Sequence, residues 1–103
     1  MAGTARSARI EAGDGGHFTV TGPLTFLTAR RTCAAGIDAF AGAGQDVVVD
    51  CTGVAESDSA GVAVLIEWRR WAHGQGRALH FANLPATIRD IVGLSGLGGV
   101  LEV

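Results

Sequence analysis

The residue types best suited to chemistry stand together in Ser57-Asp58-Ser59, immediately before an apolar, helix-like stretch. All three types favour the N-cap of a helix, because their side-chain oxygens accept hydrogen bonds from the unpaired N–H groups there. A helix start also carries a partial positive charge, so a phosphate on Ser59 would leave the helix intact while changing the surface. The same residues fit simple capping, which stabilises a helix by about 1 kcal/mol. Partner contact, a phosphorylation switch and plain capping are all compatible with this run.

The other chemistry-bearing residues form no catalytic or metal-binding pattern. His17, His73 and His80 stand on separate predicted elements, without the spacing that metal ligands require. Ser59 has no nearby base in the sequence, so a nucleophilic triad is unsupported. The glycine-rich stretch at residues 93–99 follows a predicted helix and lacks the lysine of a phosphate-binding loop. We therefore expect a protein that is not an enzyme and has no catalytic residues, metal or cofactor.

Composition and cysteine spacing narrow the class of protein further. Cys33 and Cys51 lack metal-ligand spacing, and residues 1–9 contain no apolar signal core, so we expect reduced cysteines in a cytoplasmic protein. The longest uncharged apolar run, residues 60–66, is far shorter than the ~20 residues of a membrane span. A net charge of −2 gives no reason to expect nucleic acid or an anionic membrane as a partner. Without direct membrane insertion, any work on lipids would proceed through a partner protein.

A strand and a helix must position the Asp58–Ser59 run. Residues 47–49 are a β-branched valine run, short enough for a buried strand, and a polar loop is predicted from Asp50 to Ser57. Downstream, a helix is predicted up to the glycines of residues 74–76. Its apolar stripe consists of Gly61, Val64, Leu65, Trp68 and Ala72.

The first half of the chain predicts a hairpin followed by a helix. Residues 8–12 and 17–21 alternate weakly around a glycine-rich turn, and their few large apolar residues favour the edge of a sheet. Pro23 suits a first helical turn, and residues 42–44 end the helix. Gly36 within it indicates a weak or closely packed middle. The expected buried face of this helix consists of Phe26, Ala29, Cys33, Ile37 and Phe40.

The second half predicts a strand at residues 78–82, a third helix at residues 84–92 and a last strand at residues 100–103. Ile88, Ile91 and Val92 should face inward on that helix. Alternating strands and helices imply crossover connections and a largely parallel section of sheet. We predict an α/β fold, a single mixed β-sheet with about three helices packed on it, in the order β-β-α-β-α-β-α-β. One domain should cover residues 1–103, with residues 1–7 flexible.

Several of these motifs together resemble a known family. Asp50 after a valine-rich strand, with Asp58-Ser59-Ala60-Gly61 opening an apolar helix, resembles the signature of STAS domains, the fold of bacterial anti-sigma-factor antagonists. Within that family, the Glu67-Trp68 pair and the Asn83-x-Pro85 element most resemble MlaB-type members, the small cytoplasmic subunit of the Mla phospholipid ABC transporter. The resemblance extends from about Phe18 onward. Further matching segments are Gly22-Pro23-Leu24-Thr25, Phe81-Ala82-Asn83-Leu84-Pro85 and Leu94-Ser95-Gly96-Leu97.

The resemblance implies a non-enzymatic cytosolic STAS adaptor that binds and supports the ATPase of an Mla-type phospholipid ABC transporter. ATP would be bound by the partner subunit, and this chain would lie at the inner membrane only through that partner. Neighbouring helices could cover Val62 and Ile66, so their exposure is left open. The partner-binding residues implied by the family are Asp58, Ser59, Ala60, Val62, Ala63, Ile66, Asn83, Pro85 and Thr87.

The same family also suggests an alternative, an anti-sigma-factor antagonist. In those proteins the serine after the aspartate is phosphorylated by the anti-sigma factor kinase, and Ser59 matches that serine. Asp58 matches the adjoining acidic position. Ala60 stands where a second Ser or Thr is frequent, and this departure moves the motif toward the transport-type members.

Overall fold

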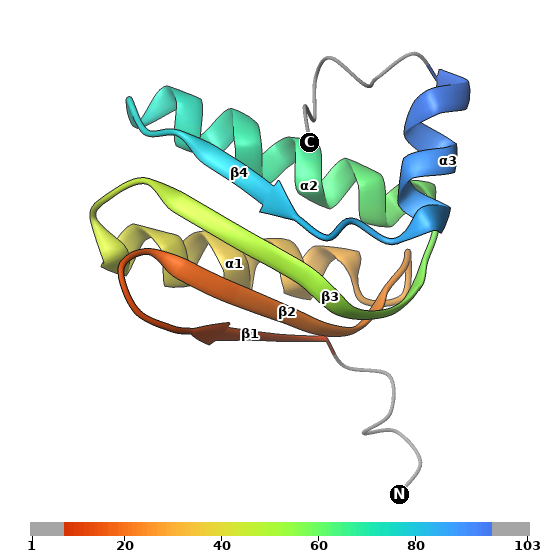
Figure 1. Ribbon diagram of the computed structural model, residues 1–103, viewed down its shortest axis with the longest axis horizontal. Helices are drawn as coiled ribbons and strands as arrows, with labels where there is room; N and C mark the ends of the chain where they lie inside the picture. Colours follow the sequence, from red (N-terminus) through yellow and green to blue (C-terminus); the bar gives the residue numbers. More distant parts are fainter. Residues whose placement is uncertain (1–7, 96–103) are drawn as a thin grey trace, which may run out of the picture.

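The computed structural model describes residues 8–95 as a four-stranded mixed sheet with three helices (Figure 1). This confirms the predicted α/β class. The strand predicted at residues 100–103 and the flexibility predicted for residues 1–7 lie outside the described residues. No helix within residues 8–95 has the length and apolar content needed to span a membrane. The elements are β1 (Arg9–Ala12), β2 (His17–Leu24), α1 (Ala29–Ala43), β3 (Val47–Ser57), α2 (Ser59–Gly74), β4 (Leu79–Ala82) and α3 (Ala86–Ser95).

The strands lie in the order β1-β2-β3-β4, and the three strands that precede helices end on the same side of the sheet, here called its carboxyl edge. β1 pairs antiparallel with β2, whereas β2, β3 and β4 run parallel to one another. Helices α1 and α2 pack side by side on one face of this sheet (Figure 1). Because parallel strands end at the same edge, the segments that lead into α1, α2 and α3 all leave the sheet there, on the right in Figure 1. This edge carries the candidate site.

The N-terminal hairpin forms as predicted, but of its two strands only β1 is an edge strand of the sheet. β2 lies between β1 and β3, so the prediction of an edge position for it is wrong. Its inward side chains, Phe18, Val20 and Leu24, are buried. Alternation with Thr19 and Thr21 supplies a sufficient apolar face for a central strand, although the strand contains few large residues.

β3 is longer than the sequence predicts, because pairing with β2 extends it through the predicted polar loop. It runs for 11 residues, and Thr21 pairs with Gly53 and Leu24 with Ser57. Val47, Val49 and Cys51 face the core. A register shift next to Thr19 and Thr21 then moves the inward position to Val54. Hydrogen-bond pairing with a neighbouring strand therefore overrides the polar composition of residues 50–57.

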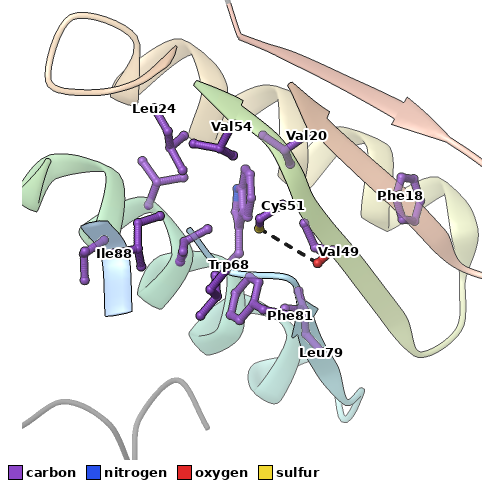
Figure 2. Close-up of a cluster of buried hydrophobic side chains, with 14 of the residues drawn as sticks. Phe18, Val20, Leu24, Val49, Cys51, Val54, Trp68, Leu79, Phe81 and Ile88 are labelled. Atoms are coloured by element: carbon purple, nitrogen blue, oxygen red, sulfur yellow. Dashed lines mark hydrogen bonds between the residues drawn. The ribbon is translucent and has the colours of Figure 1, made fainter. Parts of the chain in front are cut away.

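Trp68 fills the space between the sheet and the helices, near the middle of the core (Figure 2). It is fully buried, and its Nε1–H donates to the carbonyl oxygen of Cys33 at 3.0 Å. Phe40 packs edge-on against Trp68 with ring centroids 5.2 Å apart, and Phe18 packs edge-on against Phe40 at 5.0 Å. A Cβ at Gly36 would lie 2.5 Å from the Trp68 ring. Of the two possibilities that Gly36 left open, a weak or a closely packed middle of the helix, the structure shows close packing, and this packing sets how closely α1 approaches α2.

The helix bounds agree with the sequence for α2 and differ at the other two helices. α1 begins at Ala29, because Pro23 belongs to β2 and residues 25–28 form a turn. It ends at Ala43, within the predicted residues 42–44, and Gly44 follows as the C-cap, whose φ of 70° is the left-handed conformation that glycine favours. α3 continues past Gly93 to Ser95, beyond the predicted end at Val92. Ile88 and Val92 face the core as predicted, and Ile91 is half-buried.

Two glycine substitutions in α1 should have opposite effects on stability. Gly36→Ala should destabilise the fold by about 1–3 kcal/mol, because the added methyl group overlaps the buried Trp68 ring. Gly42→Ala is the matched control, since no atom lies within 4 Å of the added Cβ, and it should stabilise by about 0.5–1 kcal/mol through helix propensity. Urea unfolding of both variants measures the difference, and equal effects would contradict the packing described here.

Candidate functional site

Asp58 caps α2, which decides between the three capping residues suggested by the sequence. Its backbone is extended, with φ −145° and ψ −169°. One carboxylate oxygen, Oδ1, accepts from the backbone N–H of Ala60 at 2.9 Å and of Gly61 at 3.1 Å. These bonds satisfy two of the otherwise unpaired donors of the first turn. Ser59, the first residue of α2, is exposed.

The second carboxylate oxygen of Asp58 reaches a different part of the chain. Oδ2 accepts from the backbone N–H of Phe26 at 3.1 Å, across a sequence separation of 32 residues. The carboxylate thus joins the β2–α1 turn to the start of α2. The parallel arrangement of β2 and β3 makes this contact possible, because both segments leave the same edge of the sheet.

The β2–α1 turn, residues 25–28, is held by its own threonines. The buried Thr28 hydroxyl donates to the carbonyl of Pro23 at 2.9 Å and accepts from the N–H of Thr25 at 3.1 Å. The Thr28 N–H donates to the Thr25 carbonyl at 2.9 Å, which closes the turn. The Leu27 N–H donates to the Thr25 hydroxyl at 3.3 Å. Together with the hydrogen bond from the Phe26 N–H to Asp58, these bonds fix the backbone of the turn.

This fixed turn displays two large apolar side chains to solvent. Phe26 is 72% exposed and Leu27 is 64% exposed. The prediction that Phe26 lies on the buried face of α1 is wrong, because the helix begins only at Ala29. Sequence reasoning missed both residues as candidates for binding. The Thr25-x-x-Thr28 spacing after Pro23 is the signal that could have identified a turn here.

The outward face of α2 carries some of the sequence-predicted site residues and excludes one. Ser59 and Ala63 are exposed, while Ala60 and Ile66 are half-buried. Val62 is only 3% exposed and belongs to the core, so neighbouring elements cover it and its side chain cannot meet a partner. Ile66 lines a shallow hollow of about 350 Å³ together with Arg69, Arg70, His73 and Gly74.

Gly61 allows the start of α2 to lie directly on the end of β2. A Cβ at this position would overlap the carbonyl oxygen of Leu24. Gly61 is buried, and its N–H is one of the two donors to Oδ1 of Asp58. Capping and close packing therefore act together to fix where α2 begins.

The remaining predicted residues, Asn83, Pro85 and Thr87, lie in the connection from β4 to α3 and at the start of α3. Asn83 has a φ of 58°, a conformation that Asn tolerates better than most residues. Its side-chain N–H donates to Oδ1 of Asp50 at 3.2 Å, so its amide supports the loop. Thr87 is exposed and Pro85 half-buried. α3 packs against α2, which brings this segment to the same side of the molecule.

Asp50 is held in its ionised form by hydrogen bonds. Its Oδ1 also accepts from the hydroxyl of Thr52 at 2.6 Å and from the N–H of Thr52 at 2.9 Å. The Thr52 hydroxyl is the largest cause that lowers the pKa of Asp50, followed by the Thr52 N–H and Asn83. These bonds favour the charged carboxylate over the protonated acid.

The cysteines lack the properties of reactive thiols. Burial, with the nearby negative charge of Asp50 as a smaller cause, raises the pKa of Cys51 to about 12. Burial also raises the pKa of Cys33, with a smaller effect of Glu67. Both thiols therefore stay protonated near neutral pH. Within residues 8–95, no group of three His, Cys, Asp or Glu residues is arranged to hold a metal ion.

Comparison with known proteins identifies a family and a shared fold. Residues 8–102 match the family described as "Mlab, STAS domain". The structure of the murine Slc26a9 anion transporter in the inward-facing state is similar, with a TM-score of 0.67 and 19% identity over 85% of this chain and 15% of that chain. A second structure, of SLC26A9, gives a TM-score of 0.57 and 16% identity over 84% and 17%. At these identities the likeness concerns the fold alone. Comparison with curated proteins finds no match.

The pKa of Asp50 should respond to its hydrogen-bond donors. Thr52→Val should raise it toward the ordinary value of 3.8, and Asn83→Gly should raise it less, because the Thr52 hydroxyl is the larger cause. Glycine is chosen at position 83 because it accepts the positive φ. Carboxyl titration by NMR measures the shift, with Thr19→Val as the control, since Thr19 lies opposite Asp50 on β2.

The same shift should appear in the stability of the fold at low pH. A lowered pKa in the folded state adds stability above the ordinary pKa, and that stability is lost as the pH falls through the folded value. The difference in unfolding free energy between the wild type and Thr52→Val should therefore shrink below about pH 4. An unchanged pKa in Thr52→Val would contradict this assignment.

Proposed function

We propose that this chain, which belongs to the STAS domain family described as Mlab, is a non-enzymatic adaptor for the ATPase subunit of an Mla-type phospholipid ABC transporter. The observation that carries the proposal is the exposed apolar pair Phe26 and Leu27, held on a fixed turn beside the start of α2. Family membership supplies the kind of partner. We further propose that the chain works on the cytoplasmic side of the membrane through that partner.

The proposed docking surface combines the β2–α1 turn with the exposed side of the first turns of α2. An apolar centre with a polar rim is the usual composition of a protein interface, and large aromatic side chains often contribute most of its affinity. Phe26 and Leu27 supply the centre, and the exposed hydroxyl of Ser59 supplies part of the polar rim. We define the docking surface as Phe26, Leu27, Ser59, Ala60, Ala63 and Ile66, and Asp58 joins the two segments that carry these residues. Asn83, Pro85 and Thr87 would extend it onto the start of α3.

The proposed role requires no chemistry from this chain. ATP would be bound and hydrolysed by the partner, and the adaptor would act by binding one state of that partner more tightly than others. A ligand that binds a folded or active state preferentially raises the population of that state by mass action. The chain would thereby support the assembly or the turnover of the transporter.

Exposure of Ser59 favours a second candidate, an anti-sigma-factor antagonist controlled by phosphorylation. Ser59 occupies the first position of α2, where added negative charge interacts favourably with the helix dipole. A partner kinase could therefore modify Ser59 without unfolding α2. Affinity purification followed by phosphosite mapping separates the candidates. An ABC-type ATPase with unmodified Ser59 supports the adaptor role, whereas a serine kinase with modified Ser59 would replace it.

Removing the exposed apolar pair should weaken partner binding without weakening the fold. Phe26→Ala with Leu27→Ala should lower the affinity for the ATPase subunit by at least about tenfold, because buried aromatic anchors at interfaces each contribute about 2 kcal/mol or more. The unfolding free energy of this double variant should differ from that of the wild type by less than about 0.5 kcal/mol, since both side chains are exposed. Titration calorimetry and urea unfolding provide the two measurements.

Gln75→Ala is the matched control, because Gln75 is exposed at the opposite end of α2. It should leave the affinity unchanged. Equal affinities for the wild type and the Phe26/Leu27 variant would show that the partner binds elsewhere, and failure of the wild type to bind an ATPase would reject the adaptor role itself.

A further inference from the structure

We propose that Asp58 is a positioning residue, whose second carboxylate oxygen locks the β2–α1 turn against the start of α2 before any partner arrives. The partner would then meet a surface assembled in advance from two segments that are distant in the sequence. The part of this inference that concerns partner binding rests on the function proposed above. The part that concerns the conformation of the turn needs no partner and can be tested on the isolated chain.

The two oxygens of Asp58 perform separate tasks. Oδ1 accepts the N–H groups of Ala60 and Gly61, which is ordinary helix capping. Oδ2 accepts the Phe26 N–H at 3.1 Å, which capping does not require. Asp58 is itself half-buried, and its bonds to Ala60 and Gly61 are partly buried, whereas its bond to Phe26 lies at the exposed surface. The second bond is the one that links the exposed apolar pair to α2.

The hydrogen bond between the Phe26 N–H and Asp58 holds the middle of the turn. Thr25 and Thr28 bond to each other, and the Thr28 hydroxyl also donates to the carbonyl of Pro23, so these bonds fix the two ends of the turn. Phe26 lies between them, and its N–H is directed to Asp58 instead of to another residue of the turn. Loss of this bond would release the backbone at the residue whose side chain is 72% exposed. A released backbone must be ordered again on binding, which lowers affinity.

A carboxylate suits this double task, and its close relatives do not. Both carboxylate oxygens accept hydrogen bonds, whereas an asparagine side chain has one acceptor oxygen and one donor nitrogen. Asparagine and serine are nevertheless about as good as aspartate at the N-cap. Asp58→Asn and Asp58→Ser therefore keep the cap and remove the acceptor for Phe26. Two variants with side chains of different shape are used, so that the test still works if one of them misfolds.

The first test uses the isolated chain. In Asp58→Asn and Asp58→Ser, the Phe26 amide should exchange with solvent at least about tenfold faster than in the wild type, because a bond to a charged acceptor is lost. The Gly61 amide should keep its protection. Asp38→Asn, an exposed change on α1, is the control and should leave both amides unchanged. Unchanged exchange at Phe26 in both Asp58 variants would overturn the proposal.

The second test is a double-mutant cycle on affinity for the ATPase subunit. Asp58→Asn alone should weaken binding by about fivefold or more, and should add little once Phe26 and Leu27 are already alanine, because residues that act through one another are not additive. Full additivity would mean that Asp58 contacts the partner itself, which contradicts a positioning role. If the wild type binds no ATPase, the proposed function fails, while the exchange measurement still decides whether Asp58 holds the turn.

Discussion

Three backbone N–H groups from two distant segments converge on the carboxylate of Asp58. This convergence depends on the parallel pairing of β2 with β3, which brings the end of each strand to the same edge of the sheet. Gly61 adds a second constraint, because its missing side chain lets α2 start against the carbonyl of Leu24. Further along α2, the buried Trp68 fits against Gly36. α2 is therefore fixed at its start and at its middle, and the side of the helix that carries the exposed Ser59 and Ala63 remains available for binding a partner.

The family to which the chain belongs accounts for its fold, and the function has to be inferred from particular residues. STAS domains share a fold that also occurs within much larger chains, since this chain spans 15–17% of the length of the Slc26a9 structures it resembles. A fold shared with part of a transporter does not by itself define a function. The function proposed for this chain depends on particular side chains at the carboxyl edge of the sheet, above all the exposed Phe26 and Leu27.

Local chemistry made the centre of the chain predictable. The Ser57-Asp58-Ser59 run and the apolar spacing to Ala72 located α2 correctly, because N-caps and helical periodicity depend on neighbouring residues. The length of β3 was not predictable in this way, since pairing with β2 decides it. Phe26 was misassigned because its spacing with Ala29 and Cys33 imitates a helical face. The burial of Val62 depends on how neighbouring elements cover α2, which no local pattern encodes.

In the proposed complex, the partner binds the turn of Phe26 and Leu27 together with the start of α2. The most direct measurement is a residue-by-residue map of amide protection, by hydrogen exchange, in the presence and absence of the ATPase subunit. Protection should increase at residues 25–28 and 58–66 when the ATPase subunit is bound. Protection confined to the outer face of the sheet around His17, Thr19 and His80, or to the far end of α2 near Gly74, would contradict it.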